Sequence, residues 1–158
     1  MGVQATTPQA IRALIEQTIE AITPSHTETA EHAWQLMDAN EDPRGSDIRN
    51  FTVLTSLAVM DGDGMYGCDT IAKSCDLVIR VSYGGLMGND FTDAVNSDQS
   101  DLWRAIHPLP GGLGSPANGI ISFSEFLQTE PDEDPDIGES GSSNVTVDFY
   151  TNLLFHSE

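Results

Sequence analysis

Asp76-Leu-Val-Ile-Arg-Val-Ser-Tyr83 is the clearest strand in this sequence. Apolar residues recur at every second position, and β-branched and aromatic side chains of this kind favour strands. One side of the pattern holds Leu77, Ile79, Val81 and Tyr83, and the other holds Asp76, Val78, Arg80 and Ser82. The sequence therefore predicts a strand with one buried face, which Gly84-Gly85 ends.

A second alternating run, from Phe51 to Leu57, lies upstream of this strand. Asp61-Gly-Asp-Gly64 interrupts the pattern between the two runs, because aspartate and glycine favour turns. Since consecutive strands usually pair, we expect an antiparallel pair joined by a long polar connection.

Two helices are predicted, one on each side of this pair. Thr7-Pro8 is a typical helix start, and five apolar residues follow at helical spacing: Ile11, Leu14, Ile15, Ile19 and Ile22. This helix should end near Thr23-Pro24, because the residue before a proline avoids the helical region. The stretch 25–49 is mostly polar, and Ser97-Asp-Gln-Ser100 offers caps for a short second helix from Asp98 to Ile106.

The C-terminal third predicts two further strands. Residues 108–119 are rich in proline and glycine and are expected to form a loop. A strand is predicted from Gly119 to Leu127 and another from Asn144 to His156, paired as a hairpin across the acidic tip 130–143.

The order of elements is thus α-β-β-α-β-β, which predicts an α+β fold with long polar loops. We expect a mostly antiparallel sheet of about four strands, with both helices packed on one face. A chain of 158 residues and 17.0 kDa has the size of one domain, so residues 1–158 are predicted to form a single unit.

The charge of the chain excludes several classes of partner. It has 25 acidic and 6 basic residues, a formal charge of -19 and a pI of about 4.1. Nucleic-acid binding requires clustered lysine and arginine, and anionic membrane surfaces repel such a chain. We therefore expect a soluble protein without specific nucleic-acid or membrane binding.

The N-terminus and the cysteines favour use in the cytoplasm. Met1–Pro8 lacks the basic and apolar regions of a secretory signal. Cys68 and Cys75 would close only a small loop, so we interpret both as free thiols.

Residue types that carry catalysis are scarce. The four histidines, His26, His32, His107 and His156, include no pair at the spacing of a helical zinc site. The cysteines form no CxxC motif, and Gly111–Gly119 lacks the lysine of a phosphate-binding loop. We therefore predict no enzyme, no catalytic residue, no cofactor and no metal site.

The best cation candidate is the stretch from Asp61 to Asp69, because calcium prefers carboxylate and carbonyl oxygens from glycine-rich turns. It departs from the EF-hand pattern, with Tyr66 at the glycine position and Ala72 where a glutamate is required. A plain connection between strands is the favoured interpretation, and a cation site is the alternative.

The order of elements and five local strings resemble the lambda-like tail terminator (tail-completion) family of long-tailed bacteriophages. The strings are Pro8–Ile22, Arg49-Asn-Phe-Thr-Val53, Leu77-Val-Ile-Arg-Val-Ser-Tyr83, Leu102-Trp-Arg-Ala-Ile-His-Pro108 and Val145-Thr-Val-Asp-Phe-Tyr150. The polar stretch 25–47 and the acidic tip depart from smaller members of the family.

This resemblance implies a virion structural protein, assembled in the host cytoplasm and located in the tail or neck. It implies a homohexameric ring that caps the tail tube protein and joins it to the head connector or head-closure protein. The loops 57–75 and 84–97 would contact a neighbouring subunit or a partner ring, or serve only as solvated connections. The acidic surface would line a lumen through which DNA passes without sticking, or serve only solubility.

Three alternatives remain open at this point. Another neck component, such as a head-closure or connector-joining protein, would share the lack of catalytic motifs. A calcium-dependent binding module would use the stretch from Asp61 to Asp69. A small hydrolase would need a carboxylate with a raised pKa in a concave pocket.

Overall fold

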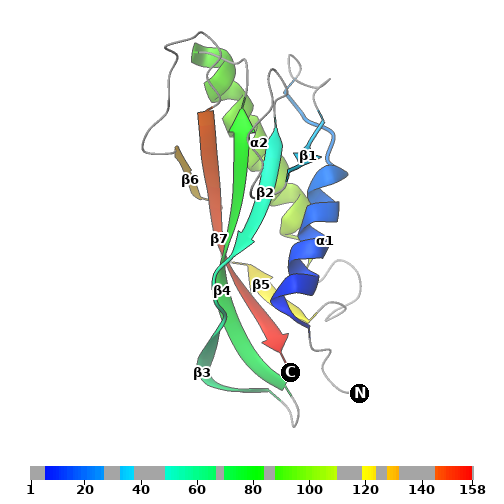
Figure 1. Cartoon of the computed structure of the whole chain (residues 1–158), viewed down its shortest axis with the longest axis vertical. Coiled ribbons are helices and arrows are strands. Elements are labelled where there is room, and N and C mark those ends of the chain that lie inside the picture. Colours follow the sequence, from blue (N-terminus) through cyan, green and yellow to red (C-terminus); the bar gives the residue numbers. More distant parts are fainter. Residues whose placement is uncertain are drawn as a thin grey trace.

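A computed structural model describes residues 6–26, 33–37, 49–66, 70–83, 88–109, 119–123, 128–131 and 145–157. Two helices and a seven-stranded mixed sheet are formed there (Figure 1). They follow in the order α1 (Pro8–Glu20), β1 (Gln35–Leu36), β2 (Asn50–Thr55), β3 (Val59–Tyr66), β4 (Thr70–Tyr83), α2 (Gly88–Ile106), β5 (Ile120–Phe123), β6 (Gln128–Pro131) and β7 (Val145–Ser157). The α+β class is confirmed. The strand number is corrected from about four to seven, and the sheet is mixed because β1 runs parallel to β2.

Two long antiparallel strands, β4 and β7, form the centre of the sheet and pair from Ile71 opposite Ser157 to Tyr83 opposite Val145. β2 and β3 follow each other along the outer edge of β4, opposite residues 77–82 and 70–74. β6 and β5 likewise share the outer edge of β7. Six of the seven strands therefore form four antiparallel rows. Each of the two outer rows consists of two shorter strands, one after the other.

The predicted break at Asp61–Gly64 is wrong, because these residues lie inside β3. The register with β4 shifts between Met60 and Met65, so the extra residues are accommodated as an irregularity within the strand. β4 also begins at Thr70, six residues before the predicted start at Asp76. Within the expected loop 57–75, residues 59–66 and 70–74 thus pair as β3 and the start of β4 and extend the sheet; we call residues 57–66 and 70–74 the arm (Figure 1).

Helix α1 begins as predicted, since Thr7 Oγ1 accepts a hydrogen bond from the Ala10 N–H at 3.2 Å and Pro8 is the first helical residue. It ends at Glu20, slightly before the predicted Thr23-Pro24. Helix α2 starts ten residues earlier than predicted, at Gly88 rather than Asp98. The expected loop 84–97 is therefore helical over 88–97, and residues 84–87 lie outside the described residues.

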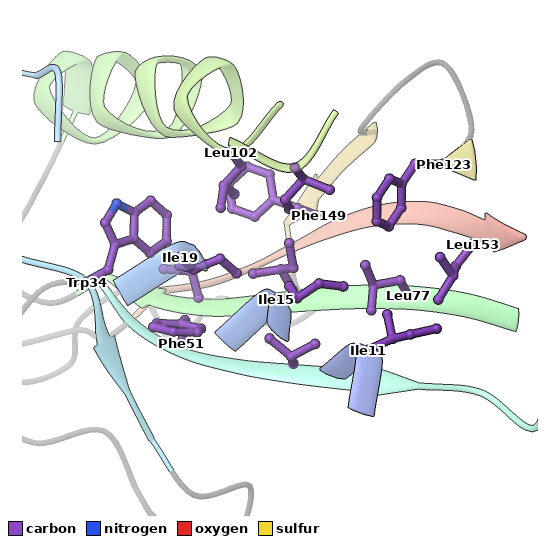
Figure 2. Packing of buried hydrophobic residues seen from close by; sticks show 14 of the residues in the cluster. Ile11, Ile15, Ile19, Trp34, Phe51, Leu77, Leu102, Phe123, Phe149 and Leu153 are labelled. Carbon is purple, nitrogen blue, oxygen red and sulfur yellow. The ribbon is translucent and has the colours of Figure 1, made fainter. Parts of the chain in front are cut away.

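The core lies between the sheet and the two helices (Figure 2). Ile11, Ile15 and Ile19 of α1 are buried against the same sheet face as Leu102 of α2. The sheet contributes a row of buried residues from β2, β4 and β7: Phe51, Val53, Leu77, Ile79, Val81, Val147, Phe149 and Leu153. Both helices thus cover one face, and the alternation predicted for 77–83 is confirmed as the buried side of β4.

Within the polar stretch 25–49, the described residues include a buried anchor. Trp34 packs edge-on against Phe51, with ring centroids 6.0 Å apart, and β1 follows it directly. Neither of the two helices combines the length and apolar character that crossing a bilayer requires.

Candidate functional site

A fully buried ion pair joins the start of β2 to the middle of α2. Arg49 Nε donates to both carboxylate oxygens of Asp98, at 3.0 and 2.9 Å. The Tyr83 hydroxyl, at the end of β4, donates to Asp98 Oδ2 at 2.8 Å. The side chains of Arg49 and Asp98 are both 0% exposed. One carboxylate therefore links three elements that are far apart in sequence.

Arg49 adopts an uncommon backbone conformation, with φ 59°. A residue with a side chain adopts this left-handed region at a cost of roughly 1–2 kcal/mol. Its carbonyl accepts a hydrogen bond from the Gln35 N–H at 3.0 Å, and its guanidinium carbon lies 5.9 Å from the centre of the Trp34 ring. These contacts fix the backbone of Arg49 at the start of β2.

A second carboxylate, Asp101, lies one helical turn after Asp98. It accepts hydrogen bonds from the Ser25 backbone N–H at 2.9 Å and from the Ser25 hydroxyl at 2.5 Å. Arg104 Nη1 approaches Asp101 Oδ1 at 3.6 Å. Asp101 therefore ties the chain that leaves α1 to α2, next to the Arg49–Asp98 pair.

Burial raises the pKa of Asp98 from 3.8 to about 6, and the negative charge of Asp101 acts in the same direction. Arg49 and the Tyr83 hydroxyl oppose this shift. The pKa of Tyr83 is well above its usual value because of burial and then the nearby Asp98 charge, so Tyr83 remains a hydrogen-bond donor. The cluster can thus hold the two helices on the sheet and store a proton near neutral pH.

We expect the Asp98 carboxyl carbon to titrate with a midpoint near pH 6 in an NMR experiment on the folded protein. Between pH 3.8 and about 6 the folded chain binds this proton more tightly than the unfolded chain does. The stability contributed by this carboxyl is therefore fully present below pH 3.8 and is lost as the pH rises through about 6. A midpoint at the ordinary aspartate value would contradict the burial argument.

A second ion pair lies on the sheet face opposite the helices. Arg80 Nε and Nη2 donate to the two carboxylate oxygens of Asp148, at 2.9 and 3.1 Å, and the Tyr150 hydroxyl approaches Asp148 Oδ2 at 3.3 Å. The Arg80 side chain is 52% exposed, so solvent screens this pair. It contrasts with the buried Arg49–Asp98 pair and serves as its natural control.

The structure places the candidate cation stretch on the arm, where Asp61–Tyr66 belong to β3. The rest of the stretch up to Asp69, including Cys68, lies outside the described residues. Among the described residues, no group of three or more histidine, cysteine, aspartate or glutamate side chains could hold a metal.

The histidines and Cys75 lie apart from the buried ion pair. The His107 ring lies beside that of Trp103 at the end of α2, with centroids 4.5 Å apart and planes tilted by 51°. His156 is buried in β7, and burial lowers its pKa. His26 follows α1, and His32 lies outside the described residues. Cys75 is a buried free thiol, as expected, and burial followed by the Asp76 charge raises its pKa.

Among the residues that the structure describes, large apolar side chains are exposed at two places. Leu57, Val59 and Met60, at the base of the arm, are 91%, 60% and 57% exposed. Leu36, on the edge strand β1, is 44% exposed. Exposed apolar groups that gather in one place often mark an interaction surface.

The sequence pattern did not reveal the buried cluster. The pattern places Arg49 at the opening of a strand, Asp98 at the start of a helix and Tyr83 on one face of a strand, and it connects none of the three. The available signal was the position of Asp98 itself, seven residues after Phe91 and four before Leu102, on the apolar stripe of a longer helix. Compared with known proteins, the chain matches no family model and no curated protein.

Proposed function

We propose that this chain is a bacteriophage virion structural protein of the tail-terminator type. It assembles into a homohexameric ring that caps the tail tube and offers a surface to the head connector or head-closure protein. The proposal rests on one observation: most of the segments in which the sequence resembles that family lie close together in the fold.

Four of the five strings meet near the buried cluster. Arg49 begins the string that opens β2, and Tyr83 ends the string in β4. Val145, which begins the string in β7, pairs directly with Tyr83. Asp98 and Asp101 lie four residues and one residue before Leu102, which begins the string at the end of α2. The resemblance therefore concerns residues that together build one end of a single sheet-and-helix unit.

The open sheet supports assembly into a ring. A ring needs a head-to-tail contact between two different surfaces of the same chain. The sheet ends at β1 on one side, and the arm carries exposed apolar side chains at the other end of the same edge. A formal charge of -19 supports a lumen whose wall repels DNA in transit.

Assembly of tail tubes tests this function directly. Purified tube protein of the same phage is polymerised with this chain and, as a control, with an equal amount of an unrelated acidic protein of similar mass. With this chain, we expect shorter tubes whose ends carry an additional ring in electron micrographs. Tubes of unchanged length without additional density would overturn the proposal, and a ring seen on the isolated connector instead would favour another neck component.

A further inference from the structure

We propose that the N-terminal half of α2, residues 88–98, is a separate cooperative unit that can leave the sheet and lose its helical structure while the rest of the chain stays folded. The buried Arg49–Asp98–Tyr83 cluster is the joint that holds this half in its docked position. The inference goes beyond the proposed function and does not depend on it.

The sequence of the N-terminal half gives it little tendency to form a helix by itself. Among residues 88–98, Ala94 is the only one with a strong intrinsic preference for helix, and glycine, asparagine, aspartate, threonine and serine make up most of the rest. Asp90 in the first turn is favourable for the helix dipole. Isolated helices shorter than about 12 residues are nevertheless marginal in water even when their sequence is favourable. The helical structure of this half therefore depends on its contacts with the sheet.

The apolar contacts of the N-terminal half are few. Its buried apolar side chains are those of Ala94 and Val95. Phe91 is only partly buried and packs edge-on against Tyr83, with ring centroids 5.7 Å apart. The C-terminal half, by contrast, places Leu102 in the core, where it is 0% exposed (Figure 2). Because apolar stabilisation follows the buried area, the C-terminal half is held more firmly than the N-terminal half.

Hydrogen bonds place the boundary between the two halves. Asp98 accepts from Arg49 and Tyr83, at the start of β2 and the end of β4. Asp101 has a separate partner, because it accepts from the Ser25 backbone N–H and hydroxyl in the segment after α1. The C-terminal half thus keeps its own polar contact when Asp98 leaves, and the boundary falls between Asp98 and Asp101.

The joint is specific but releasable. Burial of an ion pair costs hydration of both charges, and this cost offsets most of the attraction between them. Undocking returns the Asp98 carboxylate and the Arg49 guanidinium to water together, so neither charge stays buried without its partner. The cluster therefore selects one docked position for the N-terminal half and still allows that half to open, an order–disorder transition of one segment.

Hydrogen exchange of backbone amides in the full-length chain tests the proposal. The amides of residues 92–98 should have protection factors at least about 10-fold lower than those of residues 77–81 in the centre of β4. Urea at concentrations below the unfolding transition should hardly change the exchange of residues 92–98. The same urea should strongly accelerate the exchange of residues 77–81, because unfolding of the whole chain exposes far more surface.

Tyr83→Phe tests the joint. It removes one hydrogen bond to the Asp98 carboxylate, and it should lower the protection of residues 92–98 at least about 10-fold. Arg80→Met is the control, because it alters the exposed pair on the opposite sheet face and should leave the protection of residues 92–98 unchanged. Protection that does not respond to Tyr83→Phe would contradict the role of the cluster as the joint.

Leu153→Ala tests whether the N-terminal half is a separate unit. Leu153 lies eight residues along β7 from Val145, the partner of Tyr83, which is roughly 26 Å at about 3.3 Å per residue. Figure 1 shows the start of α2 and the C-terminal end of β7 at opposite ends of the molecule. The contacts of Leu153 persist when only the N-terminal half opens, so the variant should lower the protection of residues 77–81 and leave that of residues 92–98 unchanged.

Equal protection of residues 92–98 and 77–81 in the wild type, with the same response to urea, would overturn the proposal. A parallel loss in both segments of Leu153→Ala would overturn it as well, since it would show that α2 unfolds only with the whole chain. These measurements are made on the isolated chain, so neither result bears on whether the chain caps tail tubes.

Discussion

Replacing Arg49 by methionine should lower the free energy of unfolding by about 3–5 kcal/mol at about pH 7.5. Methionine keeps much of the apolar stem and leaves the backbone of residue 49 in the same left-handed conformation. It removes the charge that balances Asp98, which is 0% exposed and ionised at this pH because its pKa is about 6. Urea denaturation followed by circular dichroism measures the loss.

The penalty should shrink at about pH 5. There Asp98 already holds its proton in the wild type, so the substitution no longer leaves a buried carboxylate without its cation. The double variant, Arg49→Met with Asp98→Leu, should recover most of the loss at about pH 7.5, since replacing both partners of a buried pair costs little.

The same substitution at the exposed pair is the matched control. Arg80→Met should cost no more than about 1 kcal/mol, because Arg80 is 52% exposed and its interaction with Asp148 is screened. Equal losses for Arg49→Met and Arg80→Met would show that the buried pair has no special role in holding β2 to α2.

The parts of the fold that were predictable are those in which pattern and burial agree. The run from Leu77 to Tyr83 alternates strictly, and each of its apolar residues on that side is buried. Helix α1 has a hydroxyl cap and buried isoleucines at helical spacing. In both elements, local preference and tertiary packing favour the same structure, so the sequence alone suffices.

Helix α2 was predicted too short because tertiary contacts place polar groups inside its buried face. Asp98 is surrounded by Arg49 and Tyr83, which come from distant parts of the sequence. A local pattern contains no information about such partners, so an aspartate among apolar positions was interpreted as a helix start. The candidate site was missed for the same reason, since it exists only once β2, β4 and α2 are assembled.

The arm was missed because a strand tolerates residues that favour turns when a neighbouring strand holds it. Asp61 to Gly64 have poor strand preference, but Val59 and Met60 before them and Met65 and Tyr66 after them pair with β4. β4 continues to Thr70 because its other edge is bound to β7 down to the pairing of Ile71 with Ser157. Long-range pairing thus overrides local preference here.

Truncating Phe149 to alanine should lower the free energy of unfolding by about 3–5 kcal/mol, the range typical of a fully buried aromatic residue. Phe149 lies at the centre of β7, opposite Ile79 of β4 and Thr129 of β6, and it is 0% exposed. Figure 2 shows it between the sheet and Leu102 of α2, so its loss opens a cavity where the helix layer meets the sheet.

Leu57→Ala, measured in dilute protein, is the control for this prediction. It removes a large apolar side chain that is 91% exposed, so the free energy of unfolding should change by no more than about 0.5 kcal/mol. Because Leu57 buries almost no surface within its own chain, its side chain adds almost nothing to the free energy of unfolding. A large loss for Phe149→Ala and none for Leu57→Ala would show that the stability of the fold comes from the core and not from Leu57. Comparable losses for the two variants would mean that Leu57 packs against the body of its own chain, which its 91% exposure does not allow.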